Sequence, residues 1–360
     1  LGVSVSMPDS RTVGVGAPQH SGNFNRPGYV RVLSWDGSNW NRKGNDIQGE
    51  PNQSFGFSMS MSDSNTVAVG AIDYGQTGHY QIGKVQIFSW DGTDWTQKGS
   101  DLSGSNAFDR FGWKVSMPDN NTVAIGATTE SSSGNGYIEV YTWNGTDWVQ
   151  KGNSISGANT ELAGYSVSMP DSNTLAFGSP NNSDNGNNAG SVRIYSWNGT
   201  SWTQKGLDIL GESDGDRSGF AISMPDSNTI AIGAQNNGGG GFFSGHVRVF
   251  SWDGSNWAQL GSDIDGKNSS DRFGSSVSMP DANTIATGAI GASDFTGYVQ
   301  IYELTKPIPF GGSLLSNGCI SCDSLNVGDL FQIDINGVTD TFTVVNRTML
   351  DSMVTNGGDF

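Results

Sequence analysis

The chain has 360 residues, enough for more than one domain and for a large buried core. Only 15% of its residues are charged, and 35 Asp and Glu against 18 Lys and Arg give a formal net charge of −17. An acidic surface repels phosphate backbones and anionic lipids, so the composition argues against nucleic-acid partners and membrane adsorption. Direct membrane insertion is not expected either, because no apolar run reaches the roughly 18 residues that span a bilayer.

A unit close to F-G-x-S-V-S-M-P-D-S-N-T-V-A-V-G-A recurs six times in the first 305 residues. The glycine of its Phe-Gly step lies at Gly2, Gly56, Gly112, Gly164, Gly219 and Gly274. A second half, close to G-x-V-R-V-F-S-W-D-G-S-N-W-x-Q-K-G-x-D-I-x-G, completes the first five copies, whereas the sixth copy stops after Tyr302. A repeat of this length indicates a modular fold in which each copy forms one structural unit.

Each copy predicts four short strands and no helix. In the first copy, apolar residues alternate with serine over 3–7, a turn follows at Pro8 and Asp9, and 12–16 carries branched residues on one face and glycine on the other. In the second copy, Asp91-Gly92 predicts a hairpin between strands at 85–90 and 95–98. Four-stranded units of this length predict an all-β fold, a β-propeller of four-stranded blades. An open β-solenoid is the competing architecture, although its repeats are usually shorter.

The pairs Phe55-Gly56 and Gly70-Ala71, with the triplet Gly16-Ala17-Pro18, resemble FG-GAP repeats, the units of integrin-α-type propellers. The resemblance covers residues 1–305 and implies a propeller with six visible blades, or seven if a further repeat lies upstream. Members of that family often carry an Asp-x-Asp-x-Asp-Gly calcium loop between the first two strands. Here a tight turn with a single aspartate stands in its place, at Asp9, Asp63, Asp119, Asp171, Asp226 and Asp281.

A single carboxylate cannot supply the several oxygen ligands that calcium needs. We therefore expect these aspartates to stabilise turns, and we expect no bound metal and no cofactor. The nearest carboxylate cluster contains Asp214 and Asp216, occurs in one copy only, and is the remaining calcium candidate.

No catalytic arrangement stands out. Paired tryptophans such as Trp35 and Trp40 invite comparison with the Asp-box hairpin of sialidases, but the sequence lacks one residue of that motif, and we expect the rings to pack across the hairpin ends. The three histidines, His20, His79 and His246, show no metal-ligand spacing. We therefore expect that the chain is not an enzyme; a glycan-cleaving, sialidase-like propeller is the alternative.

The segment between the second and third strands differs most between copies, and such loops carry binding residues on rigid scaffolds. Candidate ligand-binding residues in these loops are Phe24, Arg26, Tyr74, His79, Tyr80, Phe242, Phe243 and Phe295. Exposed rings among Asn and Asp suit a protein or glycan partner. The competing interpretation is that these are ordinary variable loops whose rings fold back onto the protein.

The character of the sequence changes after residue 305. Pro307 and Pro309 mark a linker over 306–317, and residues 318–360 contain two strand-like runs joined through Asn336-Gly337. This segment resembles the lead-in to BspA-like leucine-rich repeats of Bacteroidota surface proteins, which implies further repeats beyond Phe360. In an exported protein Cys319 and Cys322 are candidates for a disulfide, with each other or with a cysteine outside this chain.

Together these features predict an extracellular, secreted or surface-anchored adhesion module of a larger bacterial protein, which recognises an extracellular protein or glycan without turnover. A purely structural spacer between other modules is a further alternative.

Overall fold

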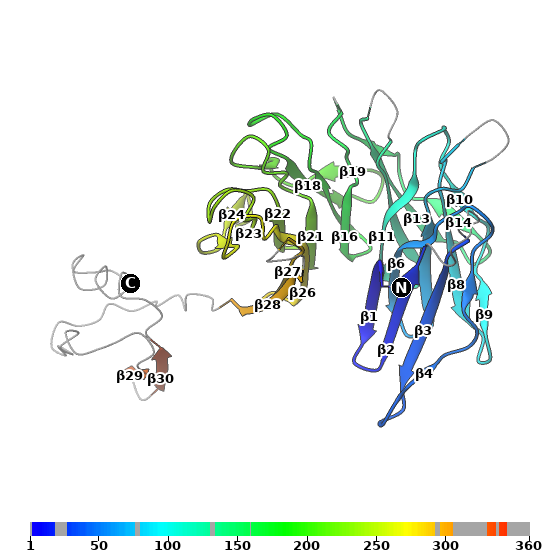
Figure 1. The fold of residues 1–360 in the computed structure, drawn as a ribbon, viewed down its shortest axis with the longest axis horizontal. Coiled ribbons are helices and arrows are strands. Elements are labelled where there is room, and N and C mark those ends of the chain that lie inside the picture. The colour runs from blue at the N-terminus through cyan, green and yellow to red at the C-terminus, as the bar shows by residue number, and fades with distance from the viewer. Residues whose placement is uncertain are drawn as a thin grey trace. The chain divides into compact units, whose positions relative to one another are not determined.

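The computed structural model describes residues 2–18, 27–75, 80–129, 134–158, 160–291 and 296–304, and the backbone of 330–335 and 338–343. Every regular element in these ranges is a β-strand. The chain divides into two compact units, Leu1–Leu304 and Thr305–Phe360. The first unit contains six antiparallel sheets that follow one another along the chain, from blue through green to orange in Figure 1. It is a six-bladed β-propeller, as the repeat pattern predicts.

Each of the first five sheets contains five strands. The first has β1 (Ser4–Asp9), β2 (Thr12–Ala17), β3 (Tyr29–Trp35), β4 (Trp40–Arg42) and β5 (Ile47–Gln48). The second has β6 (Phe55–Asp63), β7 (Thr66–Ala71), β8 (Lys84–Trp90), β9 (Trp95–Gln97) and β10 (Leu102–Ser103). The third has β11 (Phe111–Asp119), β12 (Thr122–Ala127), β13 (Tyr137–Trp143), β14 (Trp148–Gln150) and β15 (Ile155–Ser156).

The remaining blades follow the same order. The fourth sheet has β16 (Ser166–Asp171), β17 (Thr174–Ser179), β18 (Ser191–Trp197), β19 (Trp202–Gln204) and β20 (Ile209–Leu210). The fifth has β21 (Ala221–Asp226), β22 (Thr229–Ala234), β23 (His246–Trp252), β24 (Trp257–Gln259) and β25 (Ile264–Asp265). The sixth has three strands, β26 (Phe273–Asp281), β27 (Thr284–Ala289) and β28 (Tyr298–Glu303).

The outer strand of each complete blade is interrupted, which the sequence pattern does not predict. In the second sheet β9 and β10 both pair with β8, at opposite ends of that strand. Between them Gly99 has a φ of +80°, and a Cβ there would lie 2.7 Å from the ring of Trp143 in the next blade. Between β9 and β10 the chain therefore leaves the edge of β8, and at this point Gly99 lies against the third blade.

The Phe-Gly and Gly-Ala steps set the spacing between blades. A Cβ on Gly70 would lie 2.2 Å from the carbonyl oxygen of Gly112, the Phe-Gly glycine of the next blade. Gly112 itself has a φ of +91°, which favours glycine. Phe111, beside it, is fully buried in an apolar cluster between the second and third sheets. Each pair of neighbouring sheets thus shares its own core, and small residues let the sheets approach closely.

The serines of the first strands link neighbouring blades. In each of five consecutive pairs a serine hydroxyl accepts a hydrogen bond from the backbone N–H of a methionine in the next blade, as between Ser6 and Met61 at 3.0 Å. At the two ends of the series the corresponding apolar side chains are exposed: Val3, Val5 and Met7 in the first sheet, and Val299 and Ile301 in the sixth.

The second unit contains one hairpin among its described residues, formed by β29 (Leu330–Ile335) and β30 (Val338–Thr343). The first strand matches the predicted run at 330–335, whereas the second begins three residues before the predicted run at 341–345. The linker interpretation of 306–317 and the cysteines Cys319 and Cys322 lie outside the described residues. Within the described part of the chain, no helix is both long and apolar enough to cross a membrane.

Candidate functional site

The residues that recur between copies of the repeat have structural roles. The ring centroids of Trp90 and Trp95 lie 5.6 Å apart across the hairpin end of their blade, as expected, and the other four pairs repeat this packing. The Oδ1 atom of Asp63 accepts a 2.7 Å hydrogen bond from the N–H of Asn65, the turn-stabilising contact that the sequence predicts. These residues therefore stabilise the scaffold.

The two carboxylates proposed as a calcium candidate are used in loop contacts. Asp214 Oδ1 accepts a hydrogen bond from the N–H of Asn187 at 3.0 Å. Asp216 is buried, and its Oδ2 accepts hydrogen bonds from the N–H of Ser213 and the amide of Asn237. Neither belongs to a metal-ligand cluster among the described residues.

The first candidate site is a hollow on the loop face between the first and second blades, with a volume of about 680 Å³. We call it the loop-face hollow; it is lined by Glu50, Pro51, Asn52, Gln53, Asp73, Tyr74, Gly75, Tyr80 and Gln81. The Asp73 carboxylate accepts hydrogen bonds from Ser54 and Gln81 and fixes the floor. The buried Oε1 of Gln53 has no hydrogen-bond partner within the described ranges of the chain.

Aromatic rings form the wall of the loop-face hollow. Tyr80 is 73% exposed, whereas Tyr74 is half-buried, with the ammonium of Lys84 4.6 Å from its ring centroid. Two of the sequence-derived candidates, Tyr74 and Tyr80, therefore lie in one hollow.

The other sequence-derived candidates lie apart from the hollow or outside the described residues. Phe242, on the loop of the fifth blade, is 70% exposed, and Phe243 is half-buried with its ring centroid 4.0 Å from that of Phe242. The candidates outside the described residues are Phe24, Arg26, His79 and Phe295.

The second candidate site is the central channel, a cavity of about 320 Å³. Residues on or beside the first strands of all six blades line it. Phe57, Trp113, Tyr165 and Phe220 form a row of ring contacts, with centroids 4.9, 5.4 and 4.9 Å apart. Lys114 is the one charged side chain among the described lining residues. Lys114 is exposed to the space of the channel, and the surrounding blades keep bulk water away from it, which lowers the pKa of Lys114.

Sequence reasoning missed Lys114, although the alignment of the copies contains the signal. Its position holds serine in most copies, and Ser58 and Ser166 use it to donate a hydrogen bond to a glycine carbonyl of the next blade. Lysine at this position cannot form the hydrogen bond of the serine hydroxyl to the next blade, and it places an amine in the channel.

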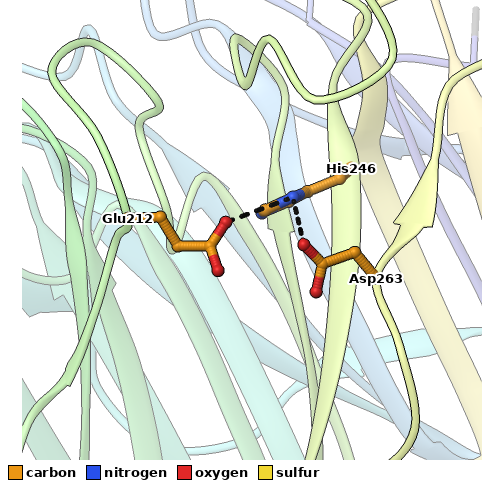
Figure 2. Close-up of side chains that lie close together, drawn as sticks. All are labelled: Glu212, His246 and Asp263. Atoms are coloured by element: carbon orange, nitrogen blue, oxygen red, sulfur yellow. Dashed lines mark ion pairs between the residues drawn. The ribbon is translucent and has the colours of Figure 1, made fainter.

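The third candidate site is a cluster of Glu212, His246 and Asp263 in the fifth blade (Figure 2). His246 begins β23, Asp263 lies between β24 and β25, and Glu212 follows β20 of the preceding blade. Burial and the nearby Arg248 guanidinium lower the pKa of His246, against the opposing effect of the two carboxylates. The spacing of the histidines in the sequence does not reveal this cluster, because the fold brings His246 together with carboxylates that are far from it in the sequence.

No family model matches the chain, and no curated protein matches it in sequence. Solved structures share its fold. One is a protein from Bacteroides uniformis whose proposed activity is that of a 6-phosphogluconolactonase, with a TM-score of 0.52 and 10% identity over 82% of this chain and 83% of that one. Another comes from a study of two prolyl endopeptidases, with a TM-score of 0.51 and 12% identity over 82% of this chain but only 38% of the other.

These similarities show the fold alone. They nevertheless correct one expectation, that the chain is not an enzyme. A protein of similar extent with the same architecture has a proposed enzymatic activity, so the propeller fold is compatible with catalysis. The deduction of a non-catalytic protein from the missing motifs is therefore wrong.

Proposed function

We propose that this chain is the recognition propeller of an exported bacterial adhesion protein and that its loop face binds a glycan. The loop-face hollow carries this proposal, because it combines exposed aromatic surface with amide and carboxylate groups. The ring of Tyr80 offers a flat apolar platform for the C–H face of a sugar. Asn52 and Glu50 offer donors and acceptors for its hydroxyl groups, the usual division of labour in a ligand pocket.

Two features of the sequence support export and surface display. The repeats resemble FG-GAP units of cell-surface propellers, and residues 306–360 resemble the lead-in to BspA-like repeats of Bacteroidota. The acidic composition argues against a nucleic acid as the partner, because its phosphate backbone would be repelled.

Binding of the full chain to a glycan array tests the proposal. We expect a restricted set of glycans to bind, Tyr80→Ser to abolish that binding, and Leu207→Ser, which alters an equally exposed apolar side chain outside the hollow, to leave it intact. Absence of any glycan binding, capture of a protein ligand alone, or unchanged binding by Tyr80→Ser would contradict the proposal.

Lys114 favours a second candidate function, an enzymatic reaction in the central channel. Lys114 lines the central channel as the one charged side chain among its described lining residues, and a lowered pKa gives a lysine a larger neutral fraction, which suits a nucleophile or general base. Incubation with panels of glycans and lactones tests this candidate: turnover that Lys114→Ala removes supports it, and turnover that survives this change or is absent excludes Lys114 from catalysis.

A further inference from the structure

The side chain of His246 is buried, and its Nδ1 atom has no hydrogen-bond partner among the residues that the structure describes. Only 1% of the residue is exposed, yet Nδ1 faces two carboxylates, with Asp263 Oδ2 at 3.5 Å and Glu212 Oε2 at 3.9 Å (Figure 2). Both separations are too long for a good hydrogen bond. Such a buried polar group usually has a partner, and the described part of the chain places none at hydrogen-bonding distance.

The second blade shows what the same positions hold when lysine replaces histidine. Lys84 lies at the position of His246, and its ammonium is 3.0 Å from Asp101 and 4.0 Å from Glu50, which correspond to Asp263 and Glu212. In the second blade a positive charge therefore lies between these two carboxylates. In the fifth blade the imidazole is shorter and leaves room between its nitrogen and the carboxylate oxygens.

The separations fit a metal ion. Zinc binds histidine nitrogen and carboxylate oxygen at about 2.0–2.2 Å, which puts neighbouring ligands of a tetrahedral site about 3.3–3.6 Å apart. The three ligand atoms of the cluster lie within 4.8 Å of one another, so small side-chain movements complete this geometry. A neutral imidazole with two carboxylates also balances the charge of a divalent cation.

We propose that Glu212, His246 and Asp263 bind a divalent transition-metal ion of the zinc type, with a fourth position open to water or to a ligand. This donor set of one nitrogen and two carboxylates favours zinc over calcium, which prefers six to eight oxygens. The carboxylates are partly exposed, at 42% and 31% of their side chains, so the ion has a path from solvent. The site is independent of the glycan proposal.

Arg248 is the charged neighbour that bears on this site. Its guanidinium lies 3.3 Å from Glu212 Oε1 and donates a 2.7 Å hydrogen bond to the carbonyl oxygen of Leu210. Arg248 thus holds one oxygen of Glu212 and leaves the other, Oε2, facing His246. A group that fixes a ligand in this way is the usual second layer of a metal site.

Titration of the metal-stripped full chain with zinc, calcium and magnesium chloride, followed by calorimetry and melting temperature, tests the proposal. We expect one zinc ion per chain and a raised melting temperature, with no comparable effect of calcium or magnesium. His246→Lys recreates the arrangement of the second blade, and we expect it to fold and to lose zinc binding. Asp263→Asn, which alters no buried ring, should weaken zinc affinity at least about tenfold.

A control variant separates this site from casual binding by the other histidines. His20→Gln combined with His79→Gln should retain the full zinc stoichiometry. Absence of zinc binding, binding that survives both His246→Lys and Asp263→Asn, or binding lost in the control variant would each overturn the proposal.

Discussion

The indole Nε1 of Trp148 donates a 2.8 Å hydrogen bond to the backbone carbonyl oxygen of Lys98, a residue of the preceding blade. The Lys98 ammonium in turn lies 5.0 Å from the ring centroid of Trp143 and 5.3 Å from that of Trp148. The same ammonium also donates hydrogen bonds to the Asn120 carbonyl oxygen and to Asn121 Oδ1, in the turn between β11 and β12 of the third blade. The Trp-Trp hairpin, the Lys-Gly step and the Asn turn of the repeat are therefore parts of one clamp between blades.

Breaking this clamp should destabilise the propeller. Lys98→Met keeps the apolar stem but removes two hydrogen bonds from a charged donor and the cation–π contact, so we expect a loss of about 1–3 kcal/mol. Urea unfolding measures this loss. Lys267→Met alters an exposed lysine and should change stability by less than about 0.5 kcal/mol. Equal effects of the two changes would contradict the role given to Lys98.

The exposed ring of Phe242 should contribute little to stability. Because the side chain is largely in solvent, we expect Phe242→Ser to change the free energy of unfolding by less than about 0.5 kcal/mol. Both changes remove the contact between the two rings, but Phe243 is half-buried, so Phe243→Ser should cost more, about 1 kcal/mol or above. A loss of about 3–5 kcal/mol for Phe242→Ser would show a core residue and remove it from any binding surface.

Acid should weaken the hairpin turns. Asp36 Oδ1 accepts hydrogen bonds from the N–H groups of Ser38 and Asn39, and these bonds lower the pKa of Asp36; Asp91 and Asp253 have equivalent contacts and shifts. A carboxyl whose pKa is lower in the folded protein stabilises it above the unfolded pKa of about 3.9, and that stability disappears as the pH falls further. We expect the midpoint of urea unfolding to decrease from pH 6 to pH 3.

The repeat supplies the matched control for this pH dependence. Asn144 occupies the same position in the third blade and accepts the same backbone hydrogen bonds without a titrating group. The variant with Asp36→Asn, Asp91→Asn and Asp253→Asn should therefore keep its turns and lose less stability between pH 6 and pH 3. An unchanged pH profile would show that other carboxyl groups dominate acid unfolding.

The sequence predicts contacts that recur in every blade because repetition reveals them. The small residues at Gly70, the turn aspartate Asp63 and the tryptophan pairs all have the roles expected from their patterns. The interrupted outer strand was not predictable in this way, because the departure at Gly99 is imposed by Trp143 of the next blade.

The candidate sites depend on features that occur once. Lys114 is the one lysine at its position of the repeat. The sequence does not show that this position lines a channel, because the channel forms only where the first strands of six blades come together. The cluster of Glu212, His246 and Asp263 joins residues from two successive copies, so neither copy alone contains a ligand pattern. The residues that recur between copies explain the scaffold, whereas the candidate sites contain residues that differ from the repeat in one copy.

Among the described residues, no further strand pairs with the outer edge of the sixth blade at β28. Leu304 donates its N–H to the carbonyl oxygen of Asn283, as Trp252 does to Asn228 in the fifth blade, so the chain follows the repeat to this point. In the fifth blade β24 and β25 then pair with β23, but the sixth sheet ends at β28. An unpaired strand edge leaves backbone groups without partners and favours aggregation.

Supplying the missing arm should therefore stabilise the protein. We expect a copy of residues 253–266, inserted between Leu304 and Thr305, to pair with β28 and to raise the melting temperature by about 2–4 °C for each kcal/mol gained. The same insertion with Ala258→Pro and Leu260→Pro in the copy lacks backbone donors for the ladder, so it should give no increase. Differential scanning calorimetry decides the matter: equal melting temperatures for the two insertions would show that the edge of β28 does not accept this arm.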